Sequence, residues 1–288
     1  MKNIKYFFNT VFSKAYWQYI FISRAGIESI LAIYGGIYLI AESLDFFSIY
    51  TKDKYGAYAF VIFFILSVVI SILIRRPIKS ILLEFKSIDI NLEVRIDDLF
   101  EVSGAVMVST NTIFEADVAG GKIAHNSLQG QFTSKYFTGN QNELINKINY
   151  ELNKLQLSKP YPMGTTITIN THGKAFYLNA MSELNSQGNA STTLDDIEQA
   201  LAGLWKHVRD EGELQELVLP VIGTGRGRIN QSRKKIISIM AESFIKTSIL
   251  GKFTGKLIIV IRSEDADNFK VNLYDIKDHL NQVLDSYI

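Results

Sequence analysis

Residues Leu217 to Arg228 read LVLPVIGTGRGR, and this stretch decides the fold. A short apolar run, Leu217 to Ile222, leads into the glycine-rich segment Gly223 to Arg228, and a helical apolar periodicity follows from Ile229 to Ile245. This order predicts a buried strand, a glycine loop and a helix. Glycines allow close backbone approach to a ligand, and the N–H groups of a helix start point at it. The two loop arginines favour an anion such as phosphate, and a tight turn without a ligand is the alternative.

The composition of the 288-residue chain excludes several classes of protein. The formal net charge is +1, so a general nucleic-acid-binding surface is not indicated. Cysteine is absent, which rules out disulfides, thiolate zinc sites and cysteine nucleophiles. The four histidines lack metal-ligand spacing, so we expect no metal site and no cofactor. His207 falls on the polar side of a predicted helix, where we expect it to be solvated.

Two apolar stretches near the N terminus predict a transmembrane hairpin. Gly56 to Ile74 contains no charged residue. At ~1.5 Å per residue it spans about 28 Å, close to the ~30 Å hydrocarbon core of a bilayer. Ala25 to Leu44 is less pure, because Glu28 and Glu42 lie near its ends, but it pairs with the second stretch as the first arm of a hairpin. Residues 45–55 then form an extracytoplasmic loop.

The charges beside these spans predict their orientation. Segment 1–24 mixes lysines with aromatic residues and has no acidic residue, which suits a helix lying on an anionic lipid surface. Positive charges precede the first span and follow the second, at Lys2, Lys5, Lys14, Arg24, Arg75, Arg76, Lys79 and Lys86. Both termini should therefore be cytoplasmic. Small residues spaced four apart raise the expectation of a homo-oligomer, at Ala32 and Gly36 and at Ser67 and Ser71.

The remainder of the chain has the character of an α/β protein. Residues 75–89 form a connector with helical periodicity at Ile78, Ile81, Leu82 and Phe85. From residue 90 onward apolar strand patterns alternate with amphipathic helices, which predicts a mixed sheet between helix layers. The predicted strands are 92–96, 104–109, 165–170, 175–181, 217–222 and 256–262, and the predicted helices are 142–155, 194–209, 229–245 and 273–284.

Several polar residues follow the predicted strands, where ligands collect in such sheets. Asp98 could accept a hydrogen bond from an exocyclic amine, or could simply form a turn. Asn111 could bond ribose hydroxyls, or could cap a turn. The segment Asp117 to Gln131 offers glycines for close approach and uncharged hydrogen-bonding groups, at Gly120, Gly121, Ser127, Gln129, Gly130 and Gln131.

Three stretches together resemble the macrodomain family, an ADP-ribose-binding α/β fold. Ile96 to Leu99 resembles the segment whose aspartate holds the adenine amine, and Asp98 takes that place. Gly104 to Asn111 resembles the strand that ends at the ribose-facing asparagine, and Pro220 to Gly225 resembles the diphosphate loop. Macrodomain hydrolases usually have a longer glycine run followed by an acidic residue, whereas here Lys122 follows two glycines. The resemblance therefore favours a binding protein over a hydrolase.

The whole arrangement resembles the ThsA family of transmembrane–macrodomain effectors of type II Thoeris anti-phage defence. This resemblance implies a protein of the bacterial inner membrane that is not an enzyme. It also implies a TIR-domain partner that makes an ADP-ribose-derived signal from NAD, such as histidine-ADP-ribose, upon which the effector oligomerises and damages the membrane. A membrane-anchored ADP-ribosyl hydrolase and a passive scaffold for ADP-ribosylated proteins remain the alternatives.

The ligand-binding set expected from the residues and the resemblance covers five segments. Arg226 and Arg228 could bind phosphate or contact a neighbouring protomer. The set consists of Asp98, Leu99, Asn111, Asp117, Gly120, Gly121, Ser127, Leu128, Gln129, Gly130, Gln131, Asn185, Ile222, Gly223, Thr224, Gly225, Arg226, Gly227 and Arg228.

Overall fold

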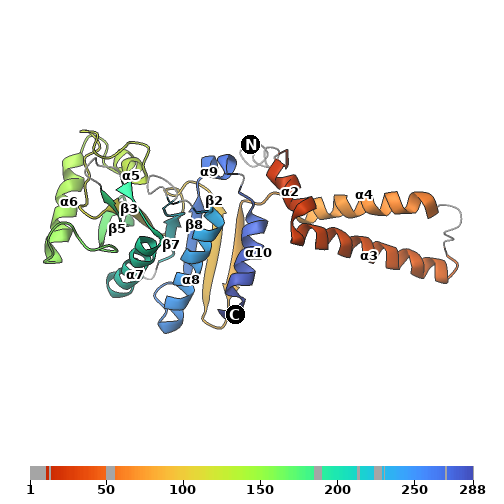
Figure 1. The fold of residues 1–288 in the computed structure, drawn as a ribbon. Coiled ribbons are helices and arrows are strands. Elements are labelled where there is room, and N and C mark those ends of the chain that lie inside the picture. Colours follow the sequence, from red (N-terminus) through yellow and green to blue (C-terminus); the bar gives the residue numbers. More distant parts are fainter. Residues whose placement is uncertain are drawn as a thin grey trace. The chain divides into compact units, whose positions relative to one another are not determined.

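The computed structural model divides the chain into two compact units, which are described separately (Figure 1). The first unit comprises Met1–Lys79 and Glu264–Asp278, and the second comprises Ser80–Ser263 and His279–Ile288. The structure describes residues 11–12, 14–49, 56–184, 190–212, 215–223, 229, 231–269 and 271–287. The chain therefore passes between the units three times, and the last boundary falls inside one helix, α10 (Leu273–Leu284).

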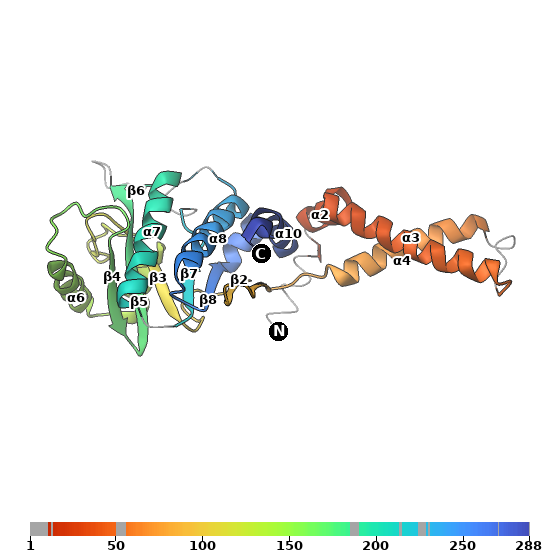
Figure 2. The same ribbon diagram turned by 90° about the horizontal axis from the view of Figure 1, so that it is seen from below.

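The first unit contains the predicted hairpin. Helix α2 (Lys14–Ile22) is followed by α3 (Arg24–Phe46), whose first turn is capped by the Ser23 hydroxyl accepting from the Gly26 N–H at 3.0 Å. Helix α4 (Gly56–Ile74) lies beside α3 in Figures 1 and 2. By length and composition α3 is able to cross a membrane, and α4 includes a shorter apolar helix over Tyr58–Ile74. The predicted helices are confirmed, and their membrane crossing remains a prediction.

One face of α2 is buried in the first unit. Tyr16, Tyr19 and Ile20 form a small apolar cluster with Ile30 of α3. Trp17 remains partly exposed beside this buried face. The described part of segment 1–24 is therefore a helix, as predicted, and its position on a lipid surface remains a prediction.

The second unit is built on one mixed sheet. The strand order is β1-β2-β8-β7-β3-β5-β4, with β6 paired to β5. The five strands from β2 to β5 in this order run parallel, and β1 and β4 pair antiparallel at the two edges. The bounds are β1 (Ser80–Phe85), β2 (Ile90–Ile96), β3 (Ala105–Asn111), β4 (Thr166–Thr171), β5 (Lys174–Leu184), β6 (Ala190–Ser191), β7 (Leu217–Pro220) and β8 (Lys256–Ile261).

Strand β1 corrects the prediction for the connector. Segment 75–89 was expected to be helical, but Ser80–Phe85 pairs with β2 in register from Ser80 opposite Arg95 to Phe85 opposite Ile90. The side chains alternate between exposed and buried, with Leu82 outward. The helical interpretation was wrong because Ile81 and Phe85 fit both a two-residue and a four-residue spacing. The sheet therefore begins before residue 90.

Helices cover both faces of the sheet (Figure 2). On one face α5 (Leu128–Tyr136) and α6 (Gln141–Lys154) pack over β3, β5 and β4, around a core that includes Val106, Phe132 and Phe176. On the other face lie α7 (Leu194–Glu211) and α8 (Arg233–Leu250), which contact each other. A short helix, α9 (Ser263–Asn268), follows β8, and a 3₁₀ turn (Asp285–Tyr287) follows α10. The predicted layered α/β architecture is confirmed.

The second corrected element is the helix after the glycine loop. It was expected to begin at Ile229, but α8 begins at Arg233, where the Ser232 hydroxyl accepts from the Lys235 N–H at 3.2 Å. A serine cap defines the helix start more strongly than apolar periodicity does. The first-turn amides of α8 therefore lie four residues further along the chain than the sequence suggested.

The third correction concerns His207 on α7. Its side chain is only 9% exposed, and one ring nitrogen lies 2.8 Å from the Thr168 hydroxyl. The ring also packs edge-on against Tyr177, with centroids 5.7 Å apart. Burial lowers the pKa of His207 below its usual value. The expectation of a solvated histidine was wrong, because β4 and β5 cover this side of the helix.

Candidate functional site

The parallel strands bring the predicted segments to one edge of the sheet. Backbone hydrogen bonds continue past the strand ends there. The Asp97 N–H donates to Ile261 O at 3.1 Å, and the Val221 N–H donates to Val260 O at 3.2 Å. The Thr112 N–H donates to Ser182 O at 3.0 Å. The segments that follow β2, β7 and β3 are therefore fixed beside the ends of β8 and β5, as expected for a ligand site of an α/β sheet.

Asp98 and Leu99 occupy different environments after β2. Asp98 is exposed, and one carboxylate oxygen accepts from the Phe100 N–H at 2.9 Å, which forms a turn. Asp97 orders the same turn, because its carboxylate accepts from the Asp98 N–H at 2.9 Å. Leu99 is 3% exposed and belongs to the hydrophobic core. The turn role of Asp98 thus accounts for one oxygen, and the Leu99 side chain is a core residue.

Asn111 ends β3 at an irregularity of the ladder with β5. It is 4% exposed, and its side-chain oxygen accepts from the N–H groups of Ile113 at 3.2 Å and Glu115 at 3.1 Å. These bonds turn the chain sharply out of the strand. Asn111 therefore organises the segment that follows it, whichever ligand that segment meets.

Gln129 connects this segment to α5 and β3. Its side-chain amide donates to Glu115 O at 2.6 Å, and its oxygen accepts from the Thr110 hydroxyl at 3.1 Å. The side chain is 4% exposed. Because both ends of the amide are satisfied inside the protein, Gln129 braces the segment after Asn111.

Asp117 holds the glycine turn that follows. Its carboxylate accepts from the Gly120 N–H at 2.6 Å and from the Gln141 side chain at 3.3 Å. The Gly120 amide first and then Gln141 lower the pKa of Asp117. A side chain at position 120 would collide with this carboxylate. Gly121 has φ +79°, a conformation that other residues rarely adopt.

The segment Ser127 to Gln131 was expected to be part of a loop and is the first turn of α5. The Ser127 hydroxyl caps the helix by accepting from the Gly130 N–H at 3.0 Å. A side chain at Gly130 would collide with Ala124 O, so this glycine permits close packing. Leu128 packs against the core, and the Gln131 side chain donates to Asn126 O at 3.0 Å. This segment therefore supplies a helix start and a brace.

The glycine loop is anchored at both ends. Ile222 is 2% exposed, and Gly223 has φ +71°. The Ile229 N–H donates to Gly223 O at 3.2 Å, which closes the segment between them. Two predicted parts of the site lie outside the residues that the structure describes, namely Asn185 and the loop residues Thr224, Gly225, Arg226, Gly227 and Arg228.

The sequence did not single out three residues that order the site. Glu115 accepts from the N–H groups of Ala116 and Asp117, each at 3.1 Å, and pairs with Lys122 at 3.2 Å. Thr110 and Gln141 complete the bonds of Gln129 and Asp117. No sequence signal marks Thr110 and Gln141, because their bonds join residues 19 and 24 positions apart in the chain. Across the described ranges, no group of three or more histidine, cysteine or acidic residues could hold a metal ion.

The strand order and the two helix layers give the second unit the fold of a macrodomain. The macrodomain of Oceanobacillus iheyensis with ADP is similar, with a TM-score of 0.51 and 14% identity, over 73% of this chain and 99% of that chain. An alanine mutant of the same macrodomain has a TM-score of 0.50 and 17% identity, over 73% of this chain and 100% of that chain. At such identities the likeness establishes the fold alone.

The family itself is established by sequence. The model described as "Thoeris protein ThsA, Macro domain" matches residues 92–262, and the chain belongs to this family. No curated protein sequence matches the chain. The resemblance noted from the sequence is thus confirmed at the level of the ThsA macrodomain, a fold with an ADP-ribose-related binding role.

Proposed function

We propose that the chain is a membrane effector of anti-phage defence whose macrodomain binds an ADP-ribose-derived signal. One observation carries the proposal: the segments that follow β2, β3 and β7 begin at the same edge of the sheet, each held there by a backbone hydrogen bond from Asp97, Thr112 or Val221. The O. iheyensis macrodomain with ADP supports a ligand that contains adenine and a diphosphate. Membership of the Thoeris family supports a signal made by a TIR-domain enzyme, such as histidine-ADP-ribose.

In this proposal each loop recognises a different part of the ligand. Asp98 accepts from the adenine amine, and Asn111 lies beside a ribose. The loop Gly223 to Arg228 surrounds the diphosphate, where a positive φ at Gly223 supports close backbone approach. Gly120, Gly121 and the start of α5 lie nearest the distal ribose, together with Asn185. Gln129 acts by holding Glu115 in place.

We propose further that the macrodomain binds its ligand without hydrolysing it. The support is that both carboxylates of the segment after Asn111 have structural partners. Glu115 accepts two backbone N–H groups and pairs with Lys122, and Asp117 accepts from Gly120. A carboxylate held in this way is poorly placed to activate water. Release of ADP-ribose from a modified protein by the purified chain would instead establish the hydrolase.

The membrane part of the proposal assigns α3 and α4 as two spans with both termini in the cytoplasm. The support is their apolar composition and the basic residues that flank them. Signal binding then promotes assembly of several copies in the inner membrane and disrupts it. A ligand can do this only by binding one arrangement more tightly than another.

Calorimetric titration of the full chain in lipid nanodiscs tests the binding step. We expect heat of binding with ADP-ribose, with histidine-ADP-ribose or with both. Asp98→Asn should weaken binding about tenfold, or about 1.4 kcal/mol, because it keeps the turn oxygen and removes the charge facing the amine. Asp89→Asn is the matched control, since Asp89 is an exposed carboxylate outside the site that pairs with Lys252 at 2.6 Å, and it should bind as the wild type does. The proposal would be refuted if neither ADP-ribose nor histidine-ADP-ribose binds.

A cellular assay tests the effector step. Cells that carry the chain together with a TIR-domain NAD-consuming enzyme should admit a membrane-impermeant dye after phage infection. Cells that carry a chain without residues 1–74 should not admit the dye. Dye entry that does not depend on the hairpin would contradict the membrane role. Protection of the cells from phage without any dye entry would favour the passive scaffold for ADP-ribosylated proteins.

A further inference from the structure

A cluster of polar and aromatic side chains lies at the base of the hairpin, within the first unit. Arg75 follows α4, Tyr19 belongs to α2, and Asp278 belongs to α10. The Tyr19 hydroxyl donates to the Asp278 carboxylate at 2.9 Å, and the Arg75 guanidinium donates to the Tyr19 hydroxyl. Arg75 also lies 3.4 Å from the same carboxylate oxygen. We name these three residues the base cluster.

Aromatic contacts reinforce the base cluster. The rings of Tyr19 and Tyr274 stack nearly parallel, with centroids 6.4 Å apart. The Arg75 guanidinium lies 5.3 Å from the Tyr19 centroid and 6.0 Å from the Tyr274 centroid, within the range of a cation–π contact. The Arg75 side chain is only 17% exposed, so these contacts are partly shielded from water.

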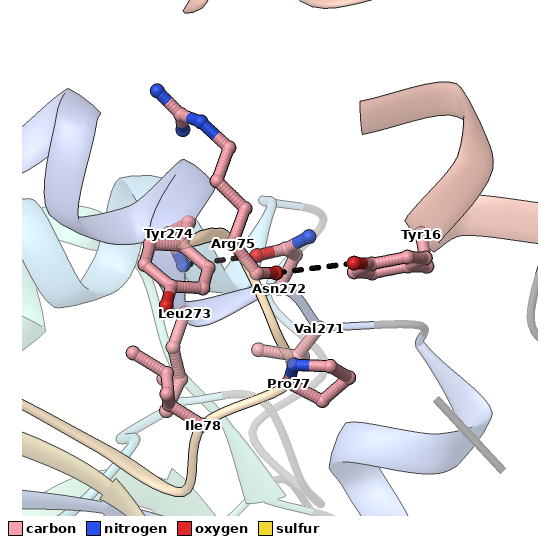
Figure 3. Close-up of a pocket in the computed structure, with 8 residues that line it drawn as sticks. All are labelled: Tyr16, Arg75, Pro77, Ile78, Val271, Asn272, Leu273 and Tyr274. Carbon is pink, nitrogen blue, oxygen red and sulfur yellow. Dashed lines mark hydrogen bonds between the residues drawn. The ribbon is translucent and has the colours of Figure 1, made fainter. Parts of the chain in front are cut away.

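The same elements satisfy the carboxyl end of α4. The last carbonyl groups of a helix have no partner within it. The Tyr274 hydroxyl donates to Ile74 O at 3.0 Å. The Tyr16 hydroxyl donates to Arg75 O at 3.2 Å, as Figure 3 shows. A small cavity of about 10 Å³ lies among these residues and is also lined by Pro77 and Asn272. Helices α2 and α10 thus hold the end of the second span from two directions.

The chain connects this base to the ligand-binding edge by a short route. The segments after β2 and β7 are hydrogen-bonded to the end of β8, at Ile261 and Val260. Two residues beyond Ile261 the chain enters α9, and from Glu264 to Asp278 it belongs to the first unit. Strand β8 therefore connects the segments after β2 and β7 to Tyr274 and Asp278 along the chain.

We propose that the base cluster couples ligand binding to the membrane hairpin. This inference rests on the proposed function and adds its means of regulation. The end of β8 responds when ligand contacts the segments after β2 and β7, and α10 carries the change to Tyr19 and Arg75. These residues flank the two spans, Tyr19 before α3 and Arg75 after α4, so both spans respond together.

Amide hydrogen exchange of the full chain in lipid nanodiscs, with and without ADP-ribose, tests the coupling. In the wild type we expect ADP-ribose to slow exchange at residues 97–99 and 221–223. We also expect exchange to change about fivefold or more at residues 72–78 and 273–279, the lower end of usual coupling between sites. In Asp278→Asn and in Tyr19→Phe the first effect should persist and the second should disappear.

Asp89→Asn is the matched control. It removes one carboxylate from another ion pair, with Lys252, on the surface of the second unit. It should behave as the wild type in both regions. If only residues 97–99 and 221–223 respond in the wild type, the coupling is overturned and the proposed function stands. The same conclusion follows if Asp278→Asn and Tyr19→Phe both behave like Asp89→Asn. A wild type with no response at the loops would overturn the proposed function, and the coupling with it.

Discussion

Gln129 offers the sharpest test of how the site is built, because it was expected to contact the ligand and instead has two partners inside the protein. Gln129→Leu keeps the approximate volume and removes the bonds to Glu115 O at 2.6 Å and to the Thr110 hydroxyl at 3.1 Å. A buried partner left without its hydrogen bond costs about 1–3 kcal/mol, so two such losses should destabilise the macrodomain by about 2–6 kcal/mol. At roughly 2–4 °C per kcal/mol for a domain of this size, the melting temperature should fall by about 4–24 °C.

The chain contains two tryptophans, which gives a clean assay. Trp205, on the buried face of α7, is 1% exposed, whereas Trp17 belongs to the first unit. In a Trp17→Phe background, thermal fluorescence of the full chain in detergent therefore follows the macrodomain alone. The matched control is Gln131→Leu, which removes an exposed bond on the same helix and should cost less than about 0.5 kcal/mol.

Two results would refute the reasoning about Gln129. If Gln129→Leu has the same melting temperature as Gln131→Leu, the two buried bonds do not stabilise the fold. If its melting temperature is unchanged and ADP-ribose binding is lost, Gln129 contacts the ligand, and the brace is not its main role.

Three further predictions follow. Gly223→Ala should destabilise the macrodomain by about 1–3 kcal/mol and weaken ADP-ribose binding in calorimetry, because φ is +71° and the new methyl would lie 2.5 Å from an Ile229 methyl. Because burial lowers the pKa of His207 below 6.5, its contribution to stability is present above pH 6.5 and is lost as the pH falls. As the pH is lowered from 7 to 5, the urea midpoint of unfolding should therefore fall less in His207→Gln than in the wild type. Asp117→Ala should speed amide exchange at residues 118–121, because it removes the acceptor of the Gly120 N–H.

The sequence predicted well those elements whose pattern is dictated by burial on one face. β2 alternates buried and half-buried residues from Ile90 to Ile96, and α7 places Ile197, Leu204 and Trp205 inward at helical spacing. Both are signals that a single segment carries by itself. The two apolar helices, α3 and α4, were also predicted from single segments, because a long run with little or no charge has few other structural solutions.

The remaining errors arose where contacts outside a segment decide its structure. Helix α5 was missed because Gly130 is typical of a loop, yet it is required where the helix approaches Ala124. His207 was expected to be solvated because its neighbours on α7 are polar, and β4 and β5 decide otherwise. Strand β1 was missed because Ile81 and Phe85 fit both a helical and a strand spacing, and pairing with β2 decides between them.

The site was predictable in position more than in role. The strand ends were placed correctly, since parallel strands bring their carboxyl ends to one edge, and the binding role of the residues there stays a prediction. The sequence left the turn roles of Asp98 and Asn111 open as alternatives, and the structure shows both of these turns. The role of Gln129 could not be predicted, because its bond to Thr110 joins two separate elements of the fold.

The boundary inside α10 has a practical consequence for anyone who wishes to work with the macrodomain alone. A fragment cut at residue 80 keeps Tyr274 and Asp278 but loses Tyr19 and Arg75, which contact them. The ring face of Tyr274 and the carboxylate of Asp278 would then be exposed to solvent on α10, a helix that the fragment retains. Such a piece should be less soluble than its composition suggests. Grafting this macrodomain onto another anchor would require α2 and the end of α4 to travel with it, so the two parts are not interchangeable modules.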